Sequence, residues 1–356
     1  MIVGILVDAF FLGNESGINT FVKHTCRMFR NNDVETYLLL DGTITDERVE
    51  KAYLDMGVKI WSDQGDLVRY HTKEHDEQAV LPSFERLLVK FKELGPSLVL
   101  ANSYVTTQAI TAIDMGDCKK ATQTHIGDVM SLDHKDKWDF STSQDFIDLL
   151  NSDKVDLICQ TDGVRTKHLE VLDKRTKAFV CHEAYFESNF THQLRKVREG
   201  AICIAGNYKR KNIEQVIDLC AQAHIPLTIL TTCKDSPDRI SLDLYAKQEG
   251  CKFNIIEKLG NQFVTSHIKS HKIMIHMADI EVCPYSVIEA LPHIPCIIKD
   301  DVPWTHNFFK QAIKIEKDDY KAVLEVYNNS EKYDTLDLKE YQETAWKQWS
   351  TYINSK

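Results

Sequence analysis

Two carboxylates in the C-terminal half of the chain stand in a pattern that can do chemistry. Glu281 and Glu289 are separated by seven residues in the segment Ala278-Asp-Ile-Glu-Val-Cys-Pro-Tyr-Ser-Val-Ile-Glu-Ala. Pro284 predicts a helix over 285–291 with Glu289 one turn inside it, and Tyr285 and Ser286 then form an N-terminus whose N–H groups favour an anion. Ser286-x-x-Glu289 also fits a capping box, a purely structural interpretation.

Three consecutive cations follow another strand. Lys209, Arg210 and Lys211 come three residues after the apolar run 201–205 and open a predicted helix. Cations at this point suit a phosphate ligand, although a solvated helix start explains them as well.

Two further loops follow predicted strands of the N-terminal half. Gly13 and Gly17 permit a tight turn whose amides can approach a phosphate or sugar, without the Gly-x-Gly-x-x-Gly spacing of a dinucleotide site. His125 and Asp128 follow a central strand in the segment Gln123-Thr-His-Ile-Gly-Asp-Val-Met-Ser-Leu, where a histidine is either structural or catalytic.

Metal sites are only weakly indicated. The segment 71–75 reads His-Thr-Lys-Glu-His and fits an inverted zinc-protease pattern, but it is polar on all sides and no partner glutamate stands out. His267, His271 and His276 are similarly weak, and no Asp-x-Asp occurs. We therefore expect no metal site.

Short β-branched runs alternate with amphipathic segments, which predicts parallel strands joined by crossover helices. The expected strands are 2–8, 36–40, 58–61, 98–101, 121–124, 157–160 and 178–181, then 201–205, 227–231, 253–256, 273–276 and 296–298. The expected helices are 18–30, 76–94, 142–151, 211–224, 241–249, 285–291 and 336–353. This pattern predicts two doubly wound α/β domains facing a cleft, over 1–186 and 187–335, followed by a C-terminal helix in 336–356.

Composition narrows the class further. The 356 residues are 43% hydrophobic and 27% charged, as in a globular protein, and no apolar run is long enough to cross a bilayer. The ten cysteines occur singly, mostly in apolar runs, which predicts buried thiols and a cytoplasmic location. The net charge of −10 means that a nucleic-acid partner requires a local basic face, for which 119–120, 134–137, 195–198 and 209–211 are candidates.

The 278–298 segment and the 205–212 segment together resemble the signatures of retaining nucleotide-sugar glycosyltransferases of the GT-B architecture. The resemblance implies that Glu281 lies near the transferred sugar and that Glu289 binds the donor ribose. It also implies that the cations around Lys211 and the turn at Tyr285 and Ser286 hold the diphosphate. The N-terminal domain then binds the acceptor, and the substrate is a nucleotide sugar, UDP-linked by preference, with no tightly bound cofactor.

The 123–132 segment is also similar to one in the DNA α-glucosyltransferases of T-even bacteriophages. This similarity implies transfer of glucose or arabinose to 5-hydroxymethylcytosine in double-stranded DNA, with His125 and Asp128 near the sugar. Two alternatives stay open: a bacterial enzyme with a lipid-linked or polysaccharide acceptor, and a non-catalytic sugar-nucleotide binder. The latter is kept because Gly206 or Asn207 stands where the family has an arginine.

Overall fold

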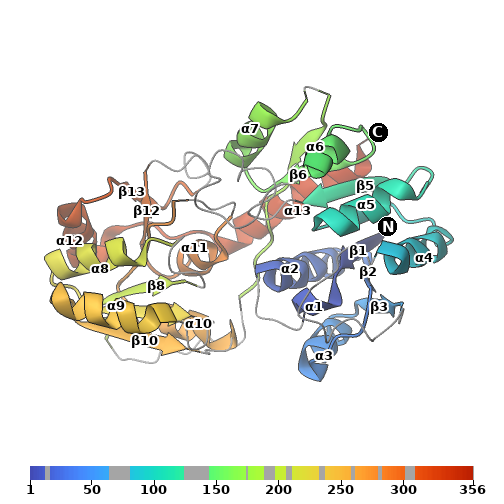
Figure 1. Cartoon of the computed structure of the whole chain (residues 1–356). Helices are drawn as coiled ribbons and strands as arrows, with labels where there is room; N and C mark the ends of the chain where they lie inside the picture. Colours follow the sequence, from blue (N-terminus) through green and yellow to red (C-terminus); the bar gives the residue numbers. More distant parts are fainter. Residues whose placement is uncertain are drawn as a thin grey trace. The chain divides into compact units, whose positions relative to one another are not determined.

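The chain folds into two compact units (Figure 1). The computed structural model describes residues 1–12, 17–63, 81–123, 144–173, 175–187, 197–205, 211–231, 237–257, 261–279, 283–300 and 309–355. Unit 1 comprises residues 1–184 and 342–356, and unit 2 comprises residues 185–341.

Unit 1 is built on a parallel sheet of seven strands in the order β3-β2-β1-β4-β5-β6-β7. The strands are β1 Ile2–Val7, β2 Glu35–Leu40, β3 Lys59–Ser62, β4 Leu98–Ala101, β5 Lys119–Gln123, β6 Asp156–Cys159 and β7 Ala178–Val180. Every strand expected in this half is present. The strand order reverses direction between β1 and β4, where a doubly wound sheet opens a crevice at its carboxyl edge.

The helices of unit 1 connect these strands. They are α1 Ala9–Leu12, α2 Gly17–Asn31, α3 Glu47–Asp55, α4 Leu81–Lys92, α5 Tyr104–Ala112, α6 Gln144–Leu150 and α7 Asp162–Val171. The sequence did not predict α1, α3, α5 or α7. For α5 the reason is that its buried residues leave no polar face from which a helical period can be read. These residues are Val105, Thr106, Thr107, Ala109 and Ile110.

The predicted C-terminal helix is α13 Leu338–Asn354, and from Gln342 onward it belongs to unit 1. Trp349 is fully buried, its ring packs edge-on against Phe29 of α2, and its Nε1 donates to the His182 carbonyl at 3.1 Å. Tyr352 donates a hydrogen bond to Asp156 of β6 at 2.9 Å. The end of the chain therefore completes the core of the first unit.

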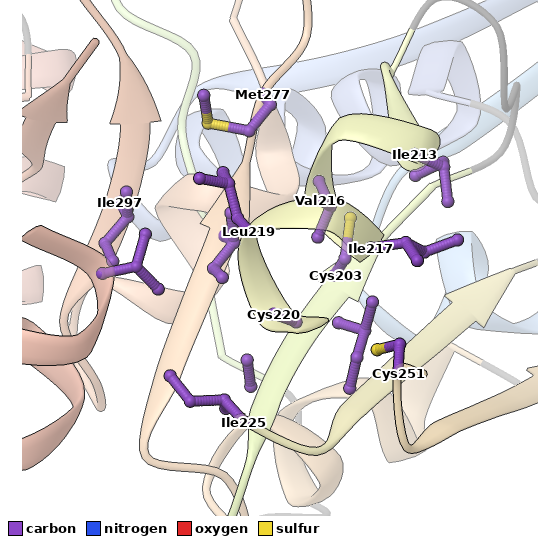
Figure 2. Packing of buried hydrophobic residues seen from close by; sticks show 14 of the residues in the cluster. Cys203, Ile213, Val216, Ile217, Leu219, Cys220, Ile225, Cys251, Met277 and Ile297 are labelled. Atoms are coloured by element: carbon purple, nitrogen blue, oxygen red, sulfur yellow. The ribbon is translucent and has the colours of Figure 1, made fainter. Parts of the chain in front are cut away.

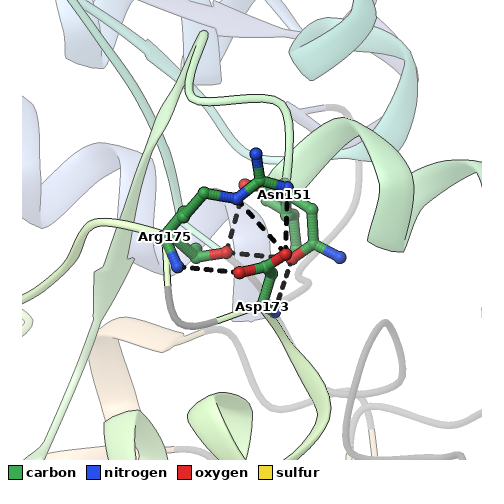
Figure 3. A network of polar contacts seen from close by, with 5 residues as sticks. Asn151, Asp173 and Arg175 are labelled. Carbon is green, nitrogen blue, oxygen red and sulfur yellow. Dashed lines mark hydrogen bonds and ion pairs between the residues drawn. The ribbon is translucent and has the colours of Figure 1, made fainter.

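A polar network fixes the approach to β7, the last strand of this sheet (Figure 3). Asn151 Oδ1 accepts hydrogen bonds from the Asp173 amide at 2.8 Å and from Thr176 Oγ1 at 2.9 Å. The Asp173 carboxylate in turn pairs with Arg175 at 3.0 Å. Because Asn151 lies just after α6, the network ties the end of that helix to the chain entering β7.

Unit 2 contains a second parallel sheet, with six strands in the order β10-β9-β8-β11-β12-β13. The strands are β8 Ala201–Ile204, β9 Leu227–Thr231, β10 Phe253–Glu257, β11 Ile273–His276, β12 Cys296–Lys299 and β13 Ile313–Ile315. All five expected strands are present. The sixth, β13, reads Ile-Lys-Ile at the sheet edge, and a three-residue strand with a central lysine gives no sequence signal.

The helices of unit 2 cover both faces of this sheet. They are α8 Ile213–Gln222, α9 Pro237–Gln248, α10 Asn261–Ile268, α11 Tyr285–Ala290 and α12 Tyr320–Asn328, and a 3₁₀ turn follows at η5 Ser330–Lys332. Alternate residues of β8 enter two different apolar clusters: Cys203 packs with α8 and α9, whereas Ile202 packs with α10 and α11. Figure 2 shows how α8 directs Val216, Leu219 and Cys220 into the first of these clusters.

The nine cysteines that the structure describes are all buried and free, as the sequence predicted. Within the stretches of the chain that the structure describes, no helix has both the length and the apolar character needed to span a membrane.

Candidate functional site

The C-terminal sheet reverses its strand order between β8 and β11, so the loops after these two strands flank a crevice at the carboxyl edge. The loop after β8 leads to Lys211 and Asn212 at the start of α8. The loop after β11 begins at Met277, and α11 with Glu289 follows it. Unit 2 therefore gathers four of the predicted donor-binding residues, Lys211, Tyr285, Ser286 and Glu289, around the ends of two adjacent strands.

Lys211 is unusually buried for a lysine, with 8% of its surface exposed. Burial raises the pKa of the Cys203 thiol on β8 to about 12, and the ammonium of Lys211 acts in the opposite direction. The electrostatic effect locates the Lys211 charge close to the β8 core rather than in bulk solvent. A charge kept at low exposure interacts more strongly with a phosphate than a solvated one.

Asn212 fastens this loop to the neighbouring strand. Its Nδ2 donates a hydrogen bond to the carbonyl of Met277 at 3.0 Å, which joins the start of α8 to the end of β11. Its backbone is left-handed, with φ 50° and ψ 49°, a conformation that asparagine tolerates better than most residues. Asn212 thus sets the position of Lys211.

Substitutions of Asn212 separate the contribution of its side-chain hydrogen bond from that of its left-handed backbone. We expect Asn212→Ala to lower the free energy of unfolding by about 2 kcal/mol, the sum of the left-handed strain and the lost hydrogen bond. Asn212→Gly loses only the hydrogen bond, so we expect roughly half that cost. Urea denaturation of the three proteins measures both values, and equal losses for alanine and glycine would contradict the strain component.

An ion pair joins the end of β12 to the chain that follows β11. Lys299 Nζ at the end of β12 lies 2.6 Å from Asp279 Oδ1, and the exposed fractions of the two side chains are only 12% and 28%. Because Asp279 follows β11, this pair restrains the chain just after that strand.

Glu289 does not form the capping box that its spacing from Ser286 allowed. The N-cap of α11 is Pro284 and has no side-chain hydrogen bond, and Ser286 lies inside the helix. Tyr285, Ser286 and Glu289 are all half-buried. The structural interpretation of the Ser286-x-x-Glu289 pattern is therefore wrong, and Glu289 has no helix-capping role to explain its presence.

The surroundings of Glu289 favour its neutral form. Removal from water raises the pKa of its carboxyl group to about 8. The buried Tyr185 lies close enough that the Glu289 charge, after burial itself, raises the pKa of the Tyr185 phenol. A carboxyl group with a perturbed pKa at a strand-order reversal is a candidate for ligand binding.

The remaining predicted site residues are distributed as follows. Gly17 is the first residue of α2. Gly13, His125, Asp128, Lys209, Arg210 and Glu281 lie outside the described residues. Their roles stay predictions from the sequence.

Some cations proposed for a basic face lie at the wrong edge. Lys119 and Lys120 begin β5, at the amino edge of the sheet, where Lys119 Nζ bonds Ser355 Oγ at 2.8 Å and Lys120 Nζ bonds the Ile113 carbonyl at 2.5 Å. Arg198 precedes β8 and donates to the His293 carbonyl at 3.0 Å. These three cations therefore lie at the amino edges of their sheets, opposite the carboxyl edges where a doubly wound sheet receives a ligand. Residues 134–137 lie outside the described ranges.

No group of three or more metal-ligating side chains suited to a metal ion occurs among the residues that the structure describes. His271 Nδ1 instead contacts the His267 carbonyl at 2.7 Å. The 71–75 segment lies outside those residues.

Sequence reasoning overlooked a polar group in unit 1. Asn102 follows β4 and is 2% exposed, and Gln123 ends β5 and is fully buried. Gln123 Nε2 donates to Glu183 Oε1 at 3.0 Å. Their only sequence signal is a polar residue at the carboxyl end of an apolar strand, which a turn explains equally well.

No protein-family model matches the sequence, and no curated protein matches it. Solved structures do match the whole fold. Sucrose-phosphate synthase from Thermosynechococcus elongatus has a TM-score of 0.71 at 11% identity, covering 99% of this chain and 96% of that one. HepE from Anabaena, solved with UDP and glucose, has a TM-score of 0.67 at 12% identity, covering 99% and 97%.

The pneumococcal O-GlcNAc transferase GtfA, solved with UDP and GlcNAc, has a TM-score of 0.66 at 12% identity, covering 99% of this chain and 98% of that one. Identities this low establish architecture and nothing more. Two parallel sheets with crossover helices, matched over nearly the full length of these structures, show that the chain has the GT-B fold.

Proposed function

We propose that this protein is a glycosyltransferase that takes a sugar from a nucleotide-sugar donor, UDP-linked by preference. The single observation that carries the proposal is the buried Lys211 at the β8/β11 strand-order reversal of a GT-B fold. HepE and GtfA, which share the fold, were solved with UDP bound. A buried cation at the carboxyl edge is the group that a diphosphate leaving group needs.

The donor site would divide the work among a few residues. Lys211, assisted by Lys209 or Arg210, neutralises the charge that develops on the diphosphate as the glycosidic bond breaks. Glu289 accepts hydrogen bonds from the ribose hydroxyls, and the turn at Tyr285 and Ser286 presents backbone N–H groups to the diphosphate. Glu281 and His125 would contact the transferred sugar, with Asp128 beside them and the Gly13 to Gly17 loop lining the donor side.

We also propose a retaining outcome, in which the acceptor hydroxyl attacks from the face that the diphosphate leaves. The preferred acceptor is 5-hydroxymethylcytosine in duplex DNA, supported by the sequence similarity of 123–132. Buried free thiols are consistent with work in the reducing cytoplasm.

A transfer assay tests donor and acceptor together. The protein is incubated with UDP-glucose, UDP-arabinose or GDP-glucose and with duplexes that contain cytosine or 5-hydroxymethylcytosine. The DNA is then digested, and mass spectrometry measures the masses of the nucleosides. We expect added hexose or pentose mass on the hydroxymethylated base only. DNA affinity should fall as salt rises, with a log–log slope near roughly −0.9 per neutralised phosphate.

Two outcomes would redirect the proposal. UDP binding without transfer to DNA, together with salt-independent DNA affinity, would contradict the DNA acceptor and favour a polysaccharide or lipid-linked one. Absence of both nucleotide binding and UDP-sugar hydrolysis would contradict the glycosyltransferase itself.

A further inference from the structure

The sheet of unit 1 has its own strand-order reversal, between β1 and β4, and polar side chains gather at its carboxyl edge. Ala101 of β4 is in register with Thr122 of β5, so the next residues along, Asn102 and Gln123, occupy neighbouring positions at that edge. The register of β4 with β1 puts Asn102 beside the end of β1 as well. Asn102 therefore lies at the point where a doubly wound sheet receives a ligand.

The backbone of Asn102 is held firmly. Its amide N–H donates to Thr106 Oγ1 at 3.2 Å, and Ser103 and Thr106 form a complete capping box at the start of α5. A side chain on such a support is positioned before any ligand arrives, which lowers the entropic cost of binding.

The side chain of Asn102, in contrast, makes no hydrogen bond of its own to the residues that the structure describes. Both Oδ1 and Nδ2 are buried and without a hydrogen-bond partner there, and the same holds for Gln123 Oε1. The other end of the Gln123 amide is engaged by Glu183, which fixes the direction of Oε1. Buried amides are rarely left in this state, and the exceptions gather at functional sites.

We propose that Asn102 and Gln123 form a subsite that binds a neutral, hydroxyl-bearing group of the acceptor substrate. This inference rests on the proposed glycosyltransferase function. The two amides offer one N–H₂ donor and two oxygen acceptors at this edge. A phosphodiester brings no proton for the two oxygens at neutral pH, whereas each hydroxyl of a sugar or hydroxymethyl group both donates and accepts.

The experiment substitutes Asn102 by leucine, which has the same branched shape and no polar atoms. Calorimetry measures binding of maltotriose, 5-hydroxymethyl-2′-deoxycytidine and dimethyl phosphate, each with and without UDP, and thermal unfolding measures stability. We expect at least one hydroxylated probe to bind roughly tenfold more weakly to Asn102→Leu, the loss of neutral hydrogen bonds. UDP affinity should be unchanged and the Tm equal or higher, because an unsatisfied buried amide is removed.

The matched control is Thr122→Val. Thr122 is also buried in this sheet, but its hydroxyl already pairs with Thr107 Oγ1 at 2.8 Å. This variant should lower the Tm and leave probe binding unchanged. Asn102→Ala provides a second test if leucine does not fit.

Two results would overturn the subsite. One is a lower Tm for Asn102→Leu with unchanged probe affinity, which would mean that an internal water molecule satisfies the amide. The other is a wild-type protein that binds UDP and neither hydroxylated probe. A wild-type protein that does not bind UDP would instead contradict the proposed function. The probe titrations without UDP would then still show whether the subsite binds a hydroxylated group.

Discussion

Lys211→Met is expected to lower the turnover of UDP-glucose by about 10²- to 10³-fold, the usual effect of removing one preorganised group that stabilises transition-state charge. Methionine retains the length and apolar stem of lysine and loses only the charge. Because negative charge builds up on the leaving diphosphate between the bound substrate and the transition state, the substitution should reduce kcat far more than it weakens binding of uridine. Steady-state kinetics and uridine calorimetry measure the two effects.

Lys272→Met is the matched control for this variant. Lys272 immediately precedes β11, at the amino edge of the same sheet, where its ammonium lies over the Tyr327 ring at 4.7 Å from the centroid. The same chemical change at the opposite edge should leave kcat unaltered. Normal turnover by Lys211→Met, with intact thermal unfolding, would transfer the diphosphate role to Lys209 or Arg210, and the triple variant would then be the comparison.

Glu289→Gln is expected to weaken UDP-glucose binding by about 1–3 kcal/mol at pH 8, the range for hydrogen bonds to a charged group. The wild-type affinity should also depend on pH. Since the pKa of Glu289 is raised to about 8 in the free protein, the carboxyl group is mostly protonated at pH 6 to 7. Ribose hydroxyls donate stronger hydrogen bonds to a carboxylate than to a protonated carboxyl group. Binding of UDP-glucose should therefore release a proton, and the affinity should rise from pH 6 to 8.

Calorimetry with UDP-glucose between pH 6 and 9, in two buffers of different ionisation enthalpy, counts the released proton. UDP-glucose is the suitable ligand because its diphosphate does not titrate in this range. Glu289→Gln should abolish the rise, whereas Glu325→Gln, a change at an exposed carboxylate of α12, should preserve it. An affinity that is flat over this range in the wild type would remove Glu289 from the ribose site.

The carboxyl group of Glu289 also makes the free energy of unfolding depend on pH. Between its ordinary pKa and about 8, the unfolded chain has lost this proton while the folded chain retains it, so Glu289 lowers stability progressively as pH rises. Glu289→Gln should therefore gain stability relative to the wild type between pH 5 and 8.

Most of the fold could be predicted from the sequence. Runs such as 227–231 and 273–276 contain almost only buried, β-branched or apolar residues, and a strand buried on both faces is the structure that needs such a run. Their alternation with amphipathic segments such as α8 predicted parallel sheets, and the structure confirms them. The candidate donor residues were found for a related reason, since Lys211 follows strand β8 and Glu289 follows strand β11.

Other features left no local trace. The sequence predicted α13 as a helix, but Trp349 and Tyr352 gave no indication that their partners are Phe29, His182 and Asp156 in unit 1. The Ser286-x-x-Glu289 spacing matched a capping box that the helix does not form. Lys119 and Lys120 appeared as a basic cluster, but only their position at the start of β5 revealed which edge of the sheet they occupy.

The sequence by itself therefore determined most of the strands and the chemical types at the strand ends, because burial and backbone hydrogen bonding act through local residue patterns. Only the tertiary structure decided which strand ends are neighbours. Asn102 and Gln123 are distant in sequence and adjacent in the sheet because β4 pairs with β5. Asn212, next to Lys211, meets the end of β11 because β8 pairs with β11. Strand pairing is a non-local choice set by the packing of whole layers, and the candidate sites exist only after that choice is made.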